Sequence, residues 1–174
     1  MENQRIRLTK RMLKEALVRL LNTKQIEHIS VSELCAEAQI NRTTFYKYYG
    51  SQFDLMNDIQ ADFMRELENS LQKNARPVSL LNTLTYIDTH RELCTVLLHT
   101  AADSGFLERI FSFSPIAQQL EEQVSRQYPD CRKEYVKEFV IYGSYSVIRK
   151  WLLSEQPEPP ETITEIILKL IETI

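Results

Sequence analysis

Apolar residues recur at helical spacing along nearly the whole chain, and no stretch alternates as a half-buried strand would. A first stripe runs from Leu8 or Thr9 to about Thr23, and a longer one covers residues 52–74. The same spacing predicts further helices at about 78–90, 91–101, 103–112, 115–128, 131–154 and 160–173. Because glycine is rare and the six prolines fall between these stripes, the prolines are expected to separate helices rather than kink them. The pattern predicts an all-α fold of about nine helices.

Two short helical patterns lie within residues 30–51, which read SVSELCAEAQINRTTFYKYYGS. Ser30 and Glu33 have the spacing of a capping box, in which Ser30 accepts from the Glu33 backbone N–H and the Glu33 side chain reaches back. An apolar face follows at helical spacing, formed by Val31, Leu34 and Ala38. These features predict a short helix that begins directly after Ser30.

The second short pattern, RTTFYKYY, follows Asn41, a residue suited to capping a helix. Phe45 and Tyr49 are four residues apart and are expected to be buried on one face. Two short helices joined by a tight break are typical of a helix-turn-helix, whose second helix enters the major groove of DNA. The sequence therefore predicts that residues 42–49 form a recognition helix.

The polar side chains of this second pattern suit DNA. Hydroxyl groups bind phosphates, threonine methyls pack on thymine methyls, and arginine reads guanine. The expected DNA contacts are Arg42, Thr43, Thr44, Tyr46, Lys47 and Tyr48, with Ser30 and Ser32 at the start of the preceding helix. The alternative is a solvated polar face on a short helix, which the residue types by themselves leave open.

The segment resembles the DNA-binding domain of the TetR family of bacterial transcriptional regulators over about 50 residues. The matching positions are Val31, Leu34, Ala38, Ile40, Thr44, Phe45, Tyr46, Tyr48, Tyr49 and Leu55. The resemblance implies a DNA-binding domain at 1–51 and a helical effector-binding and dimerisation domain at 52–174. It also implies a regulator, usually a repressor, that leaves a palindromic operator when a small effector binds.

Two positions depart from the family pattern. The family usually has glycine at the turn where this chain has Gln39, so Gln39 must accept either a left-handed backbone or a different turn. The lysine common after the recognition helix is Gln52 here, which would remove one phosphate contact.

Charge is distributed unevenly, although the net charge is only −3. Residues 1–50 hold nine Lys/Arg and five Asp/Glu, and residues 51–174 hold twelve and nineteen. The local field governs phosphate binding, so the positive N-terminal part remains compatible with DNA. Five cations cluster near the N-terminus, and either a solvated face or backbone-phosphate contacts would explain them: Arg5, Arg7, Lys10, Arg11 and Lys14.

Several other classes of function find little support. The three cysteines are widely spaced, which indicates free thiols in a reducing cytoplasm and neither a metal site nor a thiol enzyme. No signal peptide or membrane-spanning run is visible, and no phosphate loop or nucleophile–base pair suggests an enzyme or a cofactor. A small helical enzyme is the weakest alternative, and a protein of this fold that acts through a partner protein is a stronger one.

The expected helix at 131–154 carries a broad apolar surface, and the expected helix at 160–173 is rich in isoleucine. Gly143 lies in mid-helix, where glycine costs about 1 kcal/mol relative to alanine, which makes sense if another backbone or a ligand approaches closely. Two such helices from each subunit would form a four-helix interface in a two-fold dimer, the alternative being ordinary intrachain core. The expected interface residues are Phe139, Gly143, Val147, Trp151, Ile163, Ile167 and Leu170.

An effector pocket is expected among the middle helices. The aromatic residues there and the lack of a cation cluster favour a small, largely apolar ligand. The expected lining residues are Tyr86, His90, Cys94, His99, Phe106, Phe111, Phe113, Tyr142 and Tyr145. Each of them individually could equally be core packing.

Overall fold

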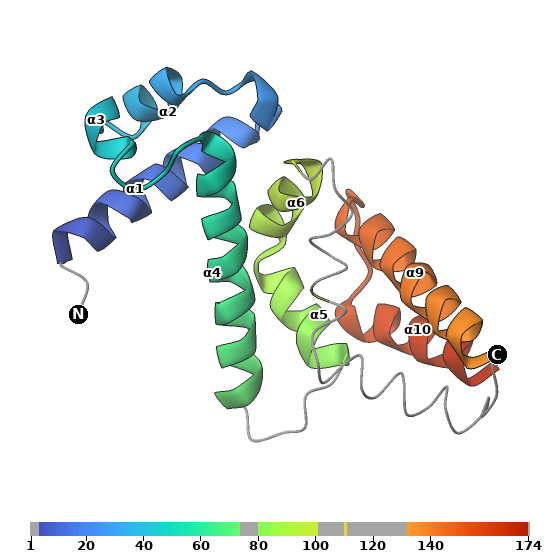
Figure 1. The fold of residues 1–174 in the computed structure, drawn as a ribbon. Helices are drawn as coiled ribbons and strands as arrows, with labels where there is room; N and C mark the ends of the chain where they lie inside the picture. The colour runs from blue at the N-terminus through green and yellow to red at the C-terminus, as the bar shows by residue number, and fades with distance from the viewer. Residues whose placement is uncertain (1–3, 74–79, 101–109, 111–131, 174) are drawn as a thin grey trace. The chain divides into compact units, whose positions relative to one another are not determined.

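The computed structural model of the 174-residue chain describes residues 4–73, 80–100, 110 and 132–173. The described segments hold eight α-helices and one short 3₁₀ helix, and no strand occurs among them, which confirms the all-α prediction (Figure 1). The elements are α1 (Gln4–Leu21), η1 (Ile26–His28), α2 (Val31–Glu37), α3 (Arg42–Phe45), α4 (Gln52–Lys73), α5 (Leu80–Thr89), α6 (Arg91–Thr100), α9 (Arg132–Leu152) and α10 (Pro160–Thr173). None of the described helices is both long and apolar enough to cross a membrane.

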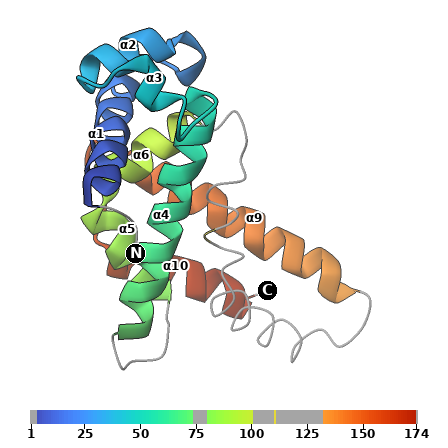
Figure 2. The same ribbon diagram turned by 60° about the vertical axis from the view of Figure 1, so that its left-hand side comes forward.

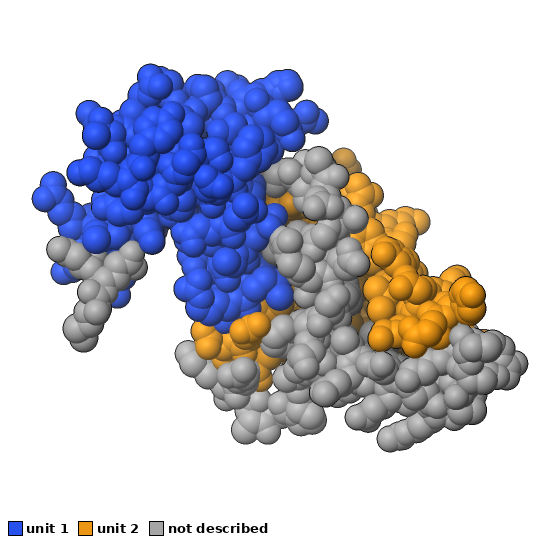
Figure 3. All heavy atoms as spheres, in the orientation of Figure 1, with its two compact units in different colours: residues 1–66 blue, residues 67–174 orange. Residues whose placement is uncertain are grey.

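The chain forms two compact units, residues 1–66 and 67–174 (Figure 3). The boundary between the units follows residue 66, inside α4. The family resemblance implied a boundary between the DNA-binding and effector-binding domains after residue 51. The first part of α4 belongs to unit 1 because α1 and the segment after α3 bind it directly, as described below.

The core of unit 1 is built from the apolar stripes of its helices. α1 contributes Leu13, Ala16 and Leu17, none of which retains exposed surface. They share the core with the fully buried side chains Leu34, Phe45 and Leu55. α1 begins at Gln4, whereas the spacing of apolar residues predicted a start at Leu8 or Thr9. The first turn of α1 is mostly exposed and polar, so the apolar pattern could not indicate it.

Side chains cap the helices of unit 1. Ser30 Oγ accepts from the Glu33 backbone N–H at 3.1 Å, as the capping box predicts, while the Glu33 carboxylate pairs with Lys24 Nζ at 2.5 Å. At the start of α4, Ser51 Oγ accepts from the Asp54 N–H, and Asp54 Oδ2 accepts from the Gly50 N–H at 3.0 Å. A Cβ at Gly50 would lie 2.9 Å from that carboxylate oxygen, so a larger residue there would displace the Asp54 side chain from its capping position.

Unit 2 packs α10 against both α5 and α9, and Figures 1 and 2 show α9 and α10 running side by side. Its core includes Leu84 and Ile87 of α5, Leu97 of α6 and Ile148 of α9, none of which has exposed surface. The helix bounds agree with the sequence pattern to within a few residues. The helices expected at 103–112 and 115–128 lie outside the described residues, apart from Ile110.

Arg91 holds the start of α6 against the end of α9. Its guanidinium donates to Asp88 Oδ1 at 2.7 and 3.0 Å and to the carbonyls of Trp151 and Leu152 at 3.0 and 3.1 Å. It also lies 4.4 Å from the centre of the Trp151 ring, whose Nε1 donates to the Glu158 carbonyl. A cation at a helix C-terminus is stabilised by the helix dipole as well as by the free carbonyls.

Candidate nucleic-acid interface

The turn between α2 and α3 has a left-handed residue. Gln39 has φ 54°, in the region that favours glycine, which settles the two possibilities that the sequence left open. The Ile40 N–H donates to the Cys35 carbonyl at 2.9 Å across this turn. The chain therefore reverses tightly enough to place α3 against α2, and Gln39 carries a side chain where the family usually has none.

α3 is shorter than the sequence predicts. Asn41 Oδ1 accepts from the Thr43 N–H at 2.8 Å and caps the helix as expected, but the α-helix ends at Phe45 rather than Tyr49. Beyond Phe45 the N–H groups of Lys47 and Tyr48 donate to carbonyls three residues back, which tightens the chain into a turn. β-branched and aromatic residues have poor helix propensity, so tertiary contacts determine this conformation.

The two aromatic residues expected in the core are buried there. Phe45 has no exposed surface and Tyr49 retains 7%. Their ring centroids lie 5.8 Å apart, and the Tyr46 ring meets Phe45 edge-on at 5.4 Å. On the opposite side Arg42, Thr43, Tyr46 and Lys47 are exposed, while Thr44 and Tyr48 are half-buried. One face of the segment thus anchors it, and the other presents the expected DNA contacts.

A partly buried cluster of Lys14, Tyr49, Asp58 and Asp62 holds the segment after α3 to α1 and α4. The Tyr49 hydroxyl donates to Asp58 Oδ2 at 2.6 Å, and Lys14 Nζ lies 2.8 Å from the same carboxylate and 2.5 Å from Asp62 Oδ2. Partial burial raises the pKa of Asp58, but hydrogen bonds from Lys14 and Tyr49 and the charges of Lys14 and Lys10 outweigh it. The pKa of Asp58 is therefore held below its ordinary value of 3.8. Lys14, one of the cations considered for phosphate contacts, is occupied by this structural role.

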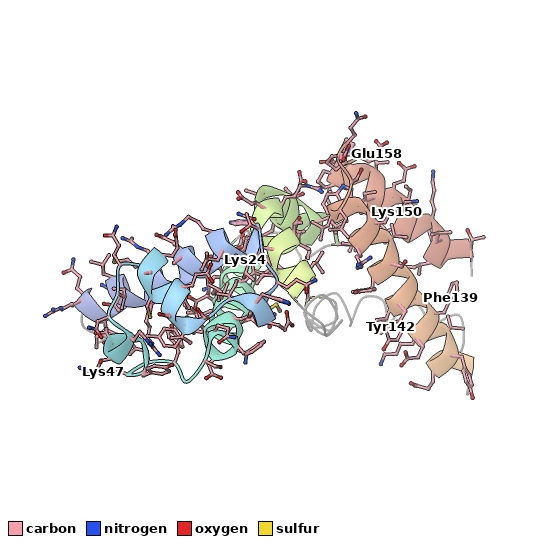
Figure 4. All side chains as sticks on the ribbon, turned by 90° about the horizontal axis from the view of Figure 1, so that it is seen from above. Lys24, Lys47, Phe139, Tyr142, Lys150 and Glu158 are labelled. Carbon is pink, nitrogen blue, oxygen red and sulfur yellow. The ribbon has the colours of Figure 1, made fainter. Side chains whose placement is uncertain are left out.

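The cations of unit 1 differ in their partners. Arg19 pairs with Glu37 at 2.7 Å and Lys24 pairs with Glu33, both joining α2 to neighbouring segments. Arg42 and Lys47 form no ion pair with any of the residues that the structure describes. No carboxylate within the described part of the chain neutralises their charge, and Lys47 projects from the unit in Figure 4. Ser32 is exposed on the first turn of α2, and Ser30 is exposed but already accepts from Glu33.

A hollow of about 530 Å³ opens beside these residues on unit 1. α1, the turn at Gln39 and the segment that contains Lys47 surround it, and no carboxylate is among the described residues that line it. The lining residues are Arg5, Ile6, Leu8, Thr9, Met12, Gln39, Ile40, Asn41, Thr44, Lys47 and Tyr48. Lys10 lies at 6.0 Å from the Tyr48 ring centre and adds positive charge nearby.

The described residues offer no arrangement suited to metal binding or thiol chemistry. Side chains of His, Cys, Asp and Glu nowhere gather there in a group of three that could hold a metal ion. Burial raises the pKa of the Cys35 thiol despite the opposing charge of Arg42, and burial raises the pKa of Cys94 to about 12. Both thiols are buried and neither forms a disulfide.

Unit 2 exposes a large apolar surface on α9 and α10. A groove of about 300 Å³ runs between the two helices, lined by Phe139, Val140, Gly143, Ser144, Val147, Ile167, Leu170, Ile171 and Thr173. Phe139 is 66% exposed and Leu170 54% exposed, and a Cβ at Gly143 would meet nothing within 4 Å. The packing of the described residues therefore does not explain Gly143.

Some residues expected at a dimer interface lie in the core of unit 2 instead. Trp151 is 4% exposed because its ring packs under Arg91, and Ile163 is 6% exposed. Ile167 is also largely buried but forms part of the groove. The two helices expose further apolar residues outside the expected interface set, among them Tyr135, Ile166 and Leu168. The spacing of apolar residues shows that both helices carry apolar positions. It does not show which side of each helix packs into the core.

The residues expected around an effector do not form one described site. Tyr86 and His90 are half-buried and stacked, with ring centroids 4.2 Å apart, and His90 Nδ1 lies 2.9 Å from the Tyr86 carbonyl. Cys94 has no exposed surface, while Tyr142 is 52% exposed and projects from α9 near Phe139 (Figure 4). Tyr145 is half-buried on α9. Phe106, Phe111 and Phe113 lie outside the described residues, as does the His99 side chain.

Comparisons with known proteins place this arrangement in a family. The TetR_C_8 family, the "Transcriptional regulator C-terminal region", matches residues 78–173, more than half of the chain. An uncharacterized HTH-type transcriptional regulator, YxbF of Bacillus subtilis (strain 168), is 24% identical over 169 residues. That alignment covers 91% of this chain and 43% of the relative, so the chain spans less than half of the relative's length.

Two solved structures share the fold. The crystal structure of a TetR transcriptional regulator from Streptococcus agalactiae 2603V matches with a TM-score of 0.74 at 21% identity, covering 97% of this chain and 96% of that one. The dihydroxyacetone kinase operon activator DhaS matches with a TM-score of 0.56 at 18% identity, covering 95% and 94%. The family match, together with the helix-turn-helix, shows that the chain belongs to the TetR family of transcriptional regulators.

Proposed function

We propose that the protein regulates transcription by binding double-stranded DNA as a homodimer, through residues 42–48 of unit 1. One observation carries the proposal: Phe45 and Tyr49 are buried, and the opposite face presents hydroxyls and two cations that have no carboxylate partner among the described residues. Arg19 and Lys24, on the same unit, each pair with a glutamate. A face that contacts only solvent gives no reason for Arg42 and Lys47 to lack such partners among the described residues.

Each exposed side chain has a distinct proposed role at the DNA. Arg42 and Thr43, at the start of α3, would lie nearest to base edges, where arginine reads guanine O6 and N7. Thr44, Tyr46 and Tyr48 would bind phosphates through their hydroxyls, with Ser30 and Ser32 contributing from α2. Lys47 would neutralise a phosphate without regard to sequence.

Two single substitutions separate these roles. Arg42→Ala should reduce discrimination between a selected operator and a scrambled duplex by about 1–3 kcal/mol. Lys47→Ala should weaken binding to both duplexes alike and flatten the salt dependence by about one charge. The matched control is Arg65→Ala, because Arg65 is an exposed cation of unit 1 about 20 Å along α4 from the helix start by helical rise.

The measurement is a fluorescence anisotropy titration of labelled duplex at several salt concentrations. Operators would first be selected from a random duplex library with the wild-type protein. Unchanged affinity and salt slope in both Arg42→Ala and Lys47→Ala would reject the proposed interface.

The proposed homodimer rests on the α9–α10 surface. Tyr135, Phe139 and Tyr142 fall at i, i+4 and i+7 on α9 and are 80%, 66% and 52% exposed. They form one ridge, with the groove at Gly143 beside it. Large exposed apolar patches on soluble proteins mark interaction sites, and a two-fold partner would place a second DNA-binding unit on the next half-site.

The regulatory mode is proposed from the family resemblance. The protein would act as a repressor, and a small apolar effector would favour a conformation in which the two recognition segments no longer match successive major grooves. Each tenfold loss of DNA affinity requires about 1.4 kcal/mol of differential effector binding. Reporter expression in cells that contain or lack the gene tests the sign of regulation. Activation of the reporter would correspond to the role of DhaS as an operon activator.

A further inference from the structure

We propose that Tyr49 is a positioning residue for DNA recognition. Its hydroxyl, bound to Asp58, fixes the course of residues 42–48 and thereby the approach of Arg42 and Thr43 to the bases. The inference rests on the proposed DNA-binding function and deepens it. It adds a residue that acts on the interface without touching DNA, because the Tyr49 side chain is buried.

The DNA-binding segment is too short to hold its own shape. α3 comprises only the four residues Arg42–Phe45, whereas isolated helices shorter than about 12–15 residues are marginal in water. Beyond Phe45 the N–H groups of Lys47 and Tyr48 donate to carbonyls three residues back, at 3.3 and 2.9 Å, which closes a turn without extending the α-helix. The orientation of the exposed face therefore depends on the side chains that anchor the segment.

The two anchors, Phe45 and Tyr49, differ in kind. The Phe45 ring has no exposed surface, but the burial of apolar surface is non-directional. The Tyr49 hydroxyl donates to Asp58 Oδ2 at 2.6 Å, within the range of charge-assisted bonds between a hydroxyl and a carboxylate, which are strong and directional. The hydroxyl thus adds a directional constraint four residues beyond Phe45, and this constraint fixes how the segment is turned.

The acceptor carboxylate is itself held between two long helices. Asp58 lies on α4, and Lys14 Nζ of α1 lies 2.8 Å from the same Oδ2 atom and 3.4 Å from the Asp58 carbonyl oxygen. Lys14 also reaches Asp62 Oδ2 at 2.5 Å, one turn further along α4. Because α1 has 18 residues and α4 has 22, the Tyr49 bond ties a short segment to a scaffold with its own apolar core.

A hydroxyl that only stabilised the fold would affect binding differently. Well below the melting temperature nearly all molecules are folded, so a modest loss of stability leaves the DNA affinity unchanged. A hydroxyl that positions the segment sets the fraction of molecules whose segment matches the groove, and the apparent Kd rises as this fraction falls. Base contacts require that geometry and phosphate contacts carry no sequence information, so the loss should fall on a selected operator rather than on a scrambled duplex.

Tyr49→Phe tests the assignment, because it removes the hydroxyl and keeps the buried ring. In the full-length protein, well below its melting temperature, the ratio of affinities for the selected operator and the scrambled duplex should fall about tenfold. The salt slope should stay unchanged, since no phosphate contact is lost. The matched control is Ile26→Val, which removes one buried methyl group in η1 and should lower the melting temperature but change the affinity ratio less than about twofold.

Substitutions of the acceptor show whether Tyr49 acts through Asp58. Asp58→Ala removes the acceptor and should reproduce the tenfold fall, whereas Asp58→Asn keeps an acceptor oxygen and should hold the ratio within about threefold of wild type. In the Asp58→Ala background, Tyr49→Phe should cause no further loss. If Tyr49→Phe did not fold, the contrast between Asp58→Ala and Asp58→Asn would give the same test.

Three results would overturn the assignment: an affinity ratio in Tyr49→Phe within about twofold of wild type, equal losses on both duplexes, or an equal fall in Ile26→Val. If Arg42→Ala still lowered the ratio in any of these cases, the proposed DNA-binding function would stand without a positioning role for Tyr49. A wild type with equal affinity for the two duplexes would remove this inference and the proposed function together.

Discussion

Asp58 is the residue whose removal should most directly loosen the DNA-binding segment without touching its exposed face. Its Oδ2 atom accepts from Tyr49 at 2.6 Å and lies 2.8 Å from Lys14 Nζ, so one carboxylate joins α1, α4 and the chain that follows α3. Asp58→Asn keeps the size of the side chain and removes its charge. The predicted result is a protein that folds but whose unit 1 is less stable.

The magnitude follows from the geometry. Hydrogen bonds to charged groups contribute about 1.5–3 kcal/mol each, but asparagine still accepts from Tyr49, and Lys14 retains Asp62 at 2.5 Å. The Asp58 side chain is also 31% exposed, so solvent screens part of the interaction. Asp58→Asn should therefore lower the free energy of unfolding by about 1–2 kcal/mol at pH 7.

The effect should depend on pH in a defined direction. The pKa of Asp58 is lowered from 3.8 in the folded protein, so its stabilisation is fully present above about pH 3.8 and is lost as pH falls through the folded value. The difference between wild type and Asp58→Asn should thus be constant from pH 7 to pH 5 and shrink below pH 3.8.

Urea unfolding followed by circular dichroism at several pH values measures this difference, and hydrogen exchange of α1 and α4 amides assigns it to unit 1. The control is Glu15→Gln, because Glu15 is 57% exposed and lies 3.6 Å from Arg11, a surface pair expected to contribute little. Equal stability of Asp58→Asn and wild type at pH 7, or a difference that persists unchanged at pH 3, would refute the reasoning.

Three further predictions concern other parts of the molecule. Gly143→Glu should give monomers in sedimentation and abolish operator binding, because a Cβ there meets none of the described residues within 4 Å and lies in the proposed interface. Gln156→Glu adds the same charge away from the groove and should stay dimeric. A wild type that sediments as a monomer at micromolar concentration would contradict the homodimer and favour a partner protein. Phe45→Ala should destabilise unit 1 by about 3–5 kcal/mol in denaturant titrations, since Phe45 has no exposed surface, and a loss below about 1 kcal/mol would contradict its place in the core. Cys94 should react with a thiol reagent at pH 8 only after unfolding, because its pKa is raised to about 12 and it is fully buried; rapid reaction of the native protein at Cys94 would contradict this.

Much of the fold follows from local pattern. Helical spacing predicts α5, α6, α9 and α10 to within a few residues, since each begins or ends near a proline, a polar break or a cap that the sequence displays. The caps at Ser30 and Asn41 and the burial of Phe45 are also predicted, because each depends on residues within a few positions.

What the sequence does not reveal depends on residues far apart. The pairing of Lys14 with Asp58 and Asp62 joins positions 44 and 48 residues apart, so nothing local indicates that this cation is structural. The early end of α3 likewise results from tertiary contacts of Tyr49 that override a continuous helical pattern. On α9 and α10, apolar residues occur on more than one side of each helix. The sequence pattern therefore placed Trp151 at the expected dimer interface, although Arg91 covers its ring.

The central claim is that two copies of the chain read one palindromic duplex through residues 42–48. The most direct measurement is equilibrium binding of the wild-type protein to a duplex selected from a random library and to its scrambled counterpart, with the stoichiometry determined in the same titration. The account predicts two chains per duplex and a preference for the selected sequence of at least about 10³-fold at physiological salt. Equal affinity for both duplexes, or saturation by one chain, would contradict it.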